Sequence, residues 1–187
     1  EDEGDIWPES FQYSRHVAGF SVYLMTLLDR YDSSLKLGKK YPNIPAAFTS
    51  YYNLQYPNND YPYIGDGHRQ YEIEYANFEM SLLLAKLNGN TQQADTFSNY
   101  LNSSVKEGLY DRGHLHKRYY GASPYYTPLQ LLWFVEEIDS TAEANVTPPR
   151  PRTKRLEVAG MNIQRNISKK NSLKNSLMGF VAGGSYI

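Results

Sequence analysis

The sequence predicts a mainly α protein with a β segment at its C-terminal end. Within residues 11–138, several stretches have apolar residues at spacings of three and four, which is the helical period. Short and long loops alternate between these stretches, as in a toroid of antiparallel helical hairpins. From Ser140 the periodicity stops, prolines accumulate and β-rich stretches follow. We therefore expect a partial α/α toroid in residues 1–140, a linker in 141–152 and strands in 153–187.

The first predicted helix runs from Phe11 to Tyr31. Pro8, Glu9 and Ser10 precede it, and a serine is a favourable N-cap while a carboxylate suits the positive end of the helix dipole. The pattern is that of an amphipathic helix. Its apolar positions, which we expect to face the core, are Phe11, Val17, Phe20, Tyr23, Leu24, Leu27, Leu28 and Tyr31.

Four further helices follow. One starts at Ile44 and Pro45 and continues through residue 54, since proline suits the first turn of a helix. Another covers residues 71–87, is closed by Asn88 and Gly89, and is followed by a shorter helix over 91–105. The segment 127–138 predicts a buried helix with Pro128 in its first turn. On helix 71–87 the shared face is Tyr75, Phe78, Leu82 and Ala85.

Two long loops and two strands complete the pattern. The loops are QYPNNDYPYIGDG at 55–67 and the aromatic, basic segment 108–124. Strands are predicted over 155–166 and 177–187, with a polar hairpin or loop between them. Because two strands cannot bury a core of their own, we expect more of the polypeptide before and after this sequence.

Composition excludes several classes of partner. The net charge is −1, from 19 basic and 20 acidic side chains, so the chain has no field that attracts nucleic acid or an anionic membrane. It has no cysteine, and no apolar run of about 18 residues that would cross a bilayer. The N-terminus, EDEGD, lacks the basic and apolar start of a signal peptide, so an export signal is expected to be removed or to lie outside this sequence.

Tyrosine is the unusual residue, with 18 copies against 7 of Phe and 2 of Trp. Its apolar ring and polar tip suit a wet groove in which rings stack on sugars and hydroxyls hydrogen-bond to them. The same side chain also suits half-buried positions between packed helices. Composition alone leaves both roles open.

The sequence supplies few groups for metal or nucleophile chemistry. His114 and His116 form the nearest thing to a metal pair, but no third ligand lies at a fitting spacing, so we expect no metal and no cofactor. The common nucleophile and phosphate-binding motifs are absent. Acid, base and stacking groups remain at helix starts and loops: Trp7, Glu9, Tyr13, His16, Asp66, His68, Arg69, Arg112, His114, Arg118 and Tyr119.

Four stretches occur in an order that resembles the heparinase II/III-like polysaccharide lyases. They are WPESFQY before a long amphipathic helix, YPYIGDG, RYYGASPYYTPLQLLW, and AGMNIQRN after the linker. The resemblance covers nearly the whole chain. It implies a fragment in which the end of an α/α toroid is followed by the first strands of an antiparallel β-sandwich. It also implies a periplasmic or secreted enzyme that acts on an acidic polysaccharide, such as a glycosaminoglycan or alginate.

The resemblance also implies the roles of individual residues. The family's E-S-x-x-Y-like motif falls on Glu9, Ser10 and Tyr13, so Tyr13 is the implied catalytic tyrosine and Glu9 a supporting carboxylate. Its partners, an Asn or His that contacts the uronate carboxyl and a histidine from the sandwich, are implied to lie before Glu1 and beyond Ile187.

Such a lyase removes the C5 proton of a 4-linked uronic acid and expels the C4 oxygen. The proton becomes removable when hydrogen bonds or positive charge neutralise the adjacent carboxylate, and a tyrosine can act as base or acid. His16 lies three residues after Tyr13 and shares its side of the helix. We expect His16, His68 and Arg69 to line the groove, together with Arg118 and Tyr119 of the basic aromatic loop.

Each of these residues also has a simpler explanation. Glu9 can be a partner of the helix dipole, Asp66 can fix a turn through its own backbone, and the charges around Arg118 can face solvent. Two other functions stay open. A glycoside hydrolase needs two facing carboxylates, for which Glu9, Asp66, Glu72, Glu74 and Glu79 are available, and a non-catalytic glycan-binding protein would use the tyrosine-rich loops for stacking.

Overall fold

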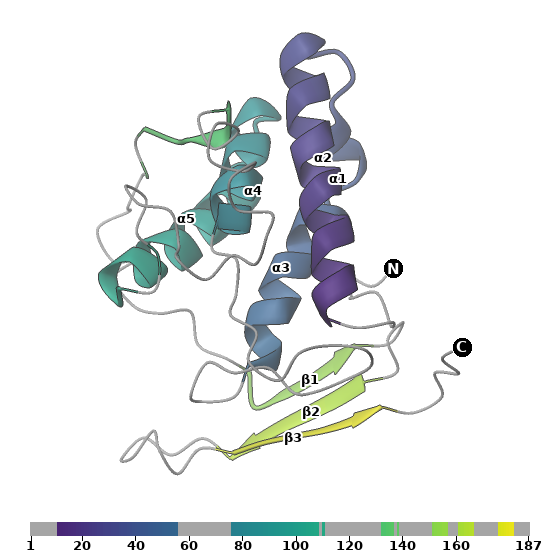
Figure 1. Cartoon of the computed structure of the whole chain (residues 1–187), viewed down its shortest axis with the longest axis vertical. Helices are drawn as coiled ribbons and strands as arrows, with labels where there is room; N and C mark the ends of the chain where they lie inside the picture. Colours follow the sequence, from purple (N-terminus) through teal and green to yellow (C-terminus); the bar gives the residue numbers. More distant parts are fainter. Residues whose placement is uncertain are drawn as a thin grey trace. The chain divides into compact units, whose positions relative to one another are not determined.

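The structure of the chain is a computed structural model that describes residues 11–55, 76–108, 110, 132–136, 138, 151–156, 161–166 and 176–181. As predicted, it is mainly helical with a β segment at the C-terminal end (Figure 1). The chain divides into two compact units. One combines Glu1–Ser21, Pro42–Ile73 and Arg150–Ile187, and the other combines Val22–Tyr41 and Glu74–Pro149. Helix α1 (Phe11–Tyr31) begins in the first unit and ends in the second.

The first unit contains the β segment, a three-stranded antiparallel sheet with the order β1-β2-β3 (Figure 1). Its strands are β1 (Thr153–Leu156), β2 (Met161–Asn166) and β3 (Ser176–Val181). Leu156 pairs with Met161, and Ile163 lies two residues further along β2, so these three buried side chains share one face. The prediction of one strand over 155–166 is wrong, because the structure divides this stretch between β1 and β2. Residues 157–160, which separate the two strands in the sequence, lie outside the described residues.

The first unit also contains α3 (Asn43–Leu54), which confirms the second predicted helix. Pro45 lies in its first turn, where the missing N–H of proline costs no helical hydrogen bond. The side chains of Ala47, Phe48, Tyr51 and Leu54 are buried. Their spacing of one, three and three residues gives α3 a single apolar face.

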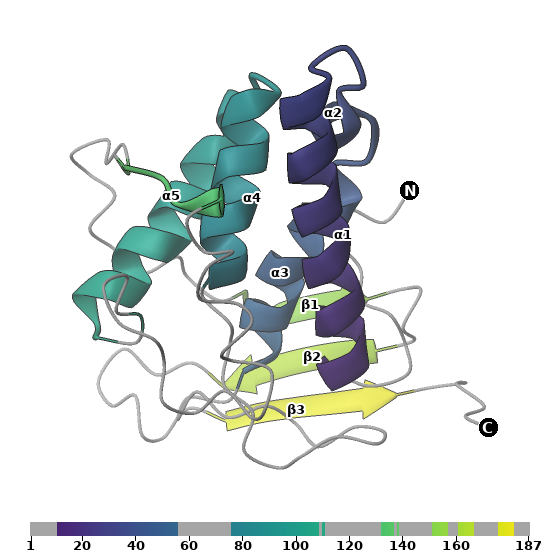
Figure 2. The same ribbon diagram turned by 45° about the horizontal axis from the view of Figure 1, so that its top comes forward.

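The second unit is built on the hairpin of α4 (Ala76–Leu87) and α5 (Thr91–Lys106), which lie side by side in both views (Figures 1 and 2). Phe78 packs between Phe97 and Tyr100, at ring-centroid distances of 6.4 and 5.1 Å. Phe78, Leu82 and Ala85 are buried, as the periodicity predicts, while Tyr75 lies outside the described residues. The interior of this hairpin is therefore aromatic and well packed.

The short helix α2 (Leu37–Lys40) has no counterpart among the predicted elements. It is held by Asp29, whose buried carboxylate accepts hydrogen bonds from the backbone N–H groups of Leu37 at 2.8 Å and Gly38 at 3.1 Å. The same carboxylate accepts a 2.7 Å bond from the side-chain amide of Asn88, which follows α4. One side chain thus joins the end of α1, α2 and the end of α4.

The predicted helix over 127–138 does not extend through its second half. Leu132 and Trp133 are helical, but Phe134 and Val135 are not. The N–H of Val135 donates to the side chain of Glu79 at 2.9 Å. The carboxylate of Glu79, far away in the sequence, thus provides an acceptor for this N–H where the helix ends. Residues 127–131 lie outside the described part of the chain.

The expectation that Val17, Phe20, Leu24 and Leu28 face the core is wrong, since all four are exposed. The buried side of α1 is formed by smaller or more polar residues: Ser14, Arg15, Ala18, Val22, Met25, Thr26 and Asp29. Small side chains allow a neighbouring helix to approach closely. The larger side chains on the more apolar face of α1 would hold such a helix further away. No helix among the described residues is both long enough and apolar enough to cross a membrane.

Candidate active site

The predicted site residues divide into two groups. Tyr13 and His16 belong to the described residues and lie in the first turns of α1. The other predicted site residues, Glu9, His68, Arg69, Arg118 and Tyr119, lie outside the described residues, as do Asp66, Glu72 and Glu74. Their roles remain predictions.

Tyr13 is accessible to a ligand, because 43% of its surface is exposed at the start of α1. His16 follows three residues later, is partly buried, and projects from the same side of the helix. A phenol and an imidazole on one side of a helix end can take up and return a proton. The predicted pairing of Tyr13 with His16 therefore fits the helical geometry.

Ser14 fastens the start of α1 to α3. It is buried, and its hydroxyl forms a hydrogen bond with the hydroxyl of Tyr51, which is also buried. The ring of Tyr51 lies 6.0 Å from that of Phe48, one turn earlier on α3. Since Ser14 is the neighbour of Tyr13, this contact fixes the turn of α1 from which Tyr13 projects.

Arg15 is a feature that sequence reasoning missed. Its side chain is only 4% exposed, although it lies two residues from the exposed Tyr13. Positions two apart on a helix point in different directions, so Arg15 is on the buried side with Ser14. A guanidinium stays charged under all ordinary conditions, so Arg15 brings a permanent positive charge into the interior at this end of α1. The row of small residues Ser14 and Ala18, one turn apart, is the sequence signal that marks this side as the buried one.

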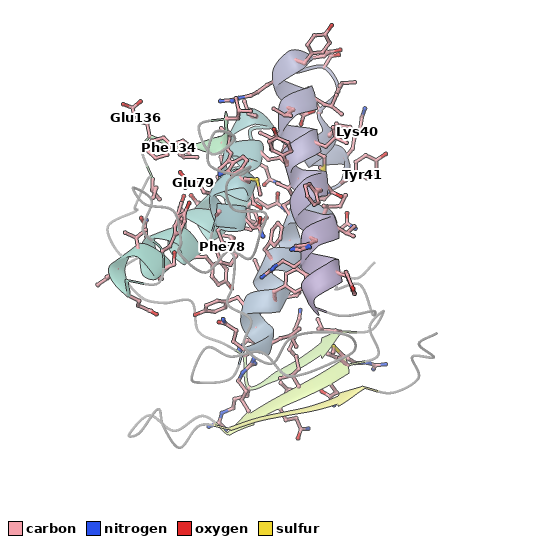
Figure 3. The ribbon with its side chains drawn as sticks, in the orientation of Figure 1. Lys40, Tyr41, Phe78, Glu79, Phe134 and Glu136 are labelled. Carbon is pink, nitrogen blue, oxygen red and sulfur yellow. The ribbon has the colours of Figure 1, made fainter. Side chains whose placement is uncertain are left out.

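Glu79 belongs to the structural framework. Its side chain is completely buried in α4, and its two carboxylate oxygens accept separate bonds (Figure 3). One oxygen accepts from the hydroxyl of Tyr110 at 2.9 Å, and the other accepts from the N–H of Val135 at 2.9 Å. A carboxylate without access to solvent cannot protonate a glycosidic oxygen or activate water, so Glu79 does not serve the pair that a hydrolase requires.

One described carboxyl has a displaced pKa, and it lies away from the residues that carry chemistry. Hydrogen bonds from the side chain and the backbone N–H of Ser34 hold the pKa of Asp32 below its ordinary value of 3.8. Asp32 directly follows α1, whereas Tyr13 lies at the helix start. No three histidine or acidic side chains within the described ranges come close enough to hold a metal ion.

Comparison with known proteins gives a family for most of the chain. Residues 3–149 match the model of a family described as "Endo-acting ulvan lyase 2nd domain". An endo-acting ulvan lyase of Formosa agariphila is 24% identical over 183 residues, which cover 97% of this chain and 21% of that protein. The chain thus spans about one fifth of the length of this relative. No solved structure is significantly similar to the chain.

Proposed function

Because this chain belongs to the family of endo-acting ulvan lyase second domains, we propose that it is part of a polysaccharide lyase that cleaves an acidic glycan by β-elimination. The name of the relative favours ulvan as that glycan, in place of the glycosaminoglycan or alginate that the sequence pattern suggested. The glycan is the proposed partner, and the activity is that of the larger polypeptide to which these residues belong. The proposed location is outside the cytoplasm, either periplasmic or secreted.

Tyr13 is the proposed catalytic residue. The supporting observation is its exposed phenol at the start of α1, on a turn that the Ser14–Tyr51 hydrogen bond fixes in place. The phenolate of Tyr13 would take the C5 proton of the uronate and then give it to the departing C4 oxygen, or Tyr13 would carry out one of these two transfers and a second residue the other. In either case the C5–H and C4–O bonds break, a C4=C5 double bond forms, and the leaving oxygen ends as a hydroxyl.

The reaction also requires a group that neutralises the uronate carboxylate, because the intermediate carries negative charge next to it. We propose His16, on the same side of α1 as Tyr13, as a substrate-binding residue. The other proposed substrate-binding residues are Glu9, His68, Arg69, Arg118 and Tyr119. The resemblance to the heparinase II/III-like lyases supports this assignment and the division into toroid (1–140), linker (141–152) and β-sandwich strands (153–187). The family match and the relative's name refer to ulvan lyases and not to heparinases.

The test is the substitution Tyr13→Phe in the full-length polypeptide, assayed with ulvan. Elimination creates a conjugated double bond, so the near-ultraviolet absorbance rises as the polymer is cut. Removal of the phenolic hydroxyl is expected to lower the rate by about 10²- to 10⁴-fold, which is the usual contribution of a general acid or base. The matched control is Tyr41→Phe, because Tyr41 is similarly exposed at 51% but points away from the helices, and it should not change the rate (Figure 3).

Three outcomes distinguish the competing functions. Loss of the absorbance gain in Tyr13→Phe and its retention in Tyr41→Phe support the lyase. New reducing ends without any rise in absorbance, from the unmodified protein, would identify a hydrolase. Binding of ulvan without cleavage, unaffected by Tyr13→Phe, would identify a non-catalytic glycan-binding protein.

A further inference from the structure

Helix α1 carries a row of exposed apolar side chains from Val17 to Tyr31. Val17 and Phe20 are each 58% exposed, and Leu24 is 55% exposed. Isolated apolar residues are common on protein surfaces, but a contiguous apolar strip on one helix marks an interaction site. We call this row the α1 seam, and it consists of Val17, Phe20, Leu24, Leu28 and Tyr31, so that Tyr13 at the helix start lies outside it.

The spacing of the α1 seam specifies the shape of its partner. Its positions are separated by three, four, four and three residues, which matches the 3.5-residue repeat of helices that pack knobs into holes. Such a strip fits the apolar face of a second α-helix that crosses at a small angle. It does not fit a glycan, because the side chains of Val17, Leu24 and Leu28 provide no hydrogen-bonding group for sugar hydroxyls.

The opposite side of α1 is already covered within the described chain. Ser14, Ala18, Val22 and Asp29 are buried there, and their contacts hold α3 through Tyr51 and α2 through Leu37 and Gly38. A helix that is packed on its small and polar side but exposes its larger apolar side is only half covered. In an array of helical hairpins, each inner helix is packed on both sides.

We propose that the α1 seam is the docking surface for an amphipathic α-helix from the part of the same polypeptide that precedes residue 3. Two findings support this occupant. The matching family is described as a second domain, so a first domain precedes it along the chain. The relative is about five times as long as this sequence, since the match covers only 21% of it, which leaves ample chain for such a helix.

Thiol labelling of the full-length polypeptide tests this proposal. The 187 residues contain no cysteine, so single cysteines can be introduced at chosen sites and their peptides identified after digestion. Val17→Cys is matched by Val105→Cys on α5, which is 42% exposed, and Leu24→Cys is matched by Leu87→Cys on α4, which is 41% exposed. In the folded full-length protein, we expect cysteines 17 and 24 to react at least about tenfold more slowly than their matched controls.

The α1 seam residues are the more exposed members of both pairs within this chain, so slow labelling must come from a covering element. Equal rates within the two pairs, whether fast or slow, would overturn the proposal. Protection that disappears on dilution, together with a change from dimer to monomer in sedimentation, would also overturn it and identify a second copy as the occupant. Protection that is independent of concentration in a monomeric protein is the result that supports it.

Discussion

Among single residues, Glu79 joins segments that are far apart in the sequence. Its bonds reach Tyr110, 31 positions away, and Val135, 56 positions away, while the carboxylate itself is completely buried. A buried carboxylate is costly unless it is hydrogen-bonded, and its donors are equally costly if the carboxylate is removed. The stability of this unit should therefore depend on Glu79 more than on any one of its donors.

The substitution Glu79→Ala should lower the free energy of unfolding by about 3–5 kcal/mol, because it removes the buried carboxylate to which the hydroxyl of Tyr110 and the N–H of Val135 donate. Tyr110→Phe removes one donor and should cost about 1–3 kcal/mol. Urea denaturation measures both. The exposed Asp95→Ala on α5 is the control and should stay within about 0.5 kcal/mol of the parent. A loss for Glu79→Ala as small as that of the control would contradict the framework role.

Arg15 and Tyr13 illustrate at the same scale how neighbouring residues take different roles. Arg15 is buried and Tyr13 is exposed, because two positions on a helix differ by about 200° around its axis. The exposed phenol is therefore accessible to the proposed substrate, while the buried cation belongs to the interior. This is why the functional test changes Tyr13 and not Arg15.

At the scale of elements, the packing of α2 against α4 depends on the absence of a side chain at Gly38. A Cβ atom there would lie 2.6 Å from the amide nitrogen of Asn88 and 2.9 Å from the Cγ of Leu84. The amide of Asn88 cannot easily move, since it donates to both Asp29 and the carbonyl of Leu84. The two helices are thus held at a distance that only glycine permits.

Gly38→Ala should therefore destabilise the protein by about 1–3 kcal/mol, the usual cost of inserting a methyl group into a packed contact. Lys39→Ala, at the next and exposed position, is the control and should have little effect. Thermal unfolding of both variants measures the difference. An equal melting temperature for the two would show that α2 can shift away from α4 at no cost.

The turn between α4 and α5 depends on two adjacent residues. Gly89 has a φ of 65°, which ends α4 in the left-handed conformation that favours glycine. The side chain of Asn90 then accepts a bond from the N–H of Gln93 at 3.2 Å and so caps the first turn of α5. These two residues make the hairpin a tight one.

Asn90→Ala should cost about 1 kcal/mol of stability through loss of the cap, whereas Asn90→Ser should retain most of it, since serine is an equally good N-cap. Denaturant midpoints of the two variants provide the comparison. If Asn90→Ser is as destabilised as Asn90→Ala, the amide has a role other than capping.

At the scale of the whole molecule, we propose that the chain is one part of a larger enzyme. It covers about one fifth of the related ulvan lyase, and its α1 seam offers a long apolar surface to a further helix. The proposed activity also needs a group that neutralises the uronate carboxylate, in addition to Tyr13. Catalysis and the completion of the helical array are therefore both expected from the full-length polypeptide.

Most of the helices were predictable because local signals determine them. Pro45 marks the start of α3, the Asn88–Gly89 pair marks the end of α4, and the Asn90 cap marks the start of α5. Each of these signals acts within one turn of the chain. The end of the helix near Trp133 was not predictable, because Glu79 takes the N–H of Val135 from 56 positions away. Of the site, the position of Tyr13 and His16 in the first turns of α1 was predictable, while the exposure of this side of the helix and the burial of Ser14 and Arg15 were not.

The sequence by itself determined the helices α1, α3, α4 and α5 and the presence of a β segment at the C-terminal end. These properties depend on periodicity and on residues close together in the chain. Only the tertiary structure decided which side of α1 is buried, because periodicity gives a helix an apolar face but does not say what covers it. It also decided that Asp29 and Glu79 are buried anchors, since their partners Asn88 and Val135 lie 59 and 56 positions away and meet them only in the folded chain.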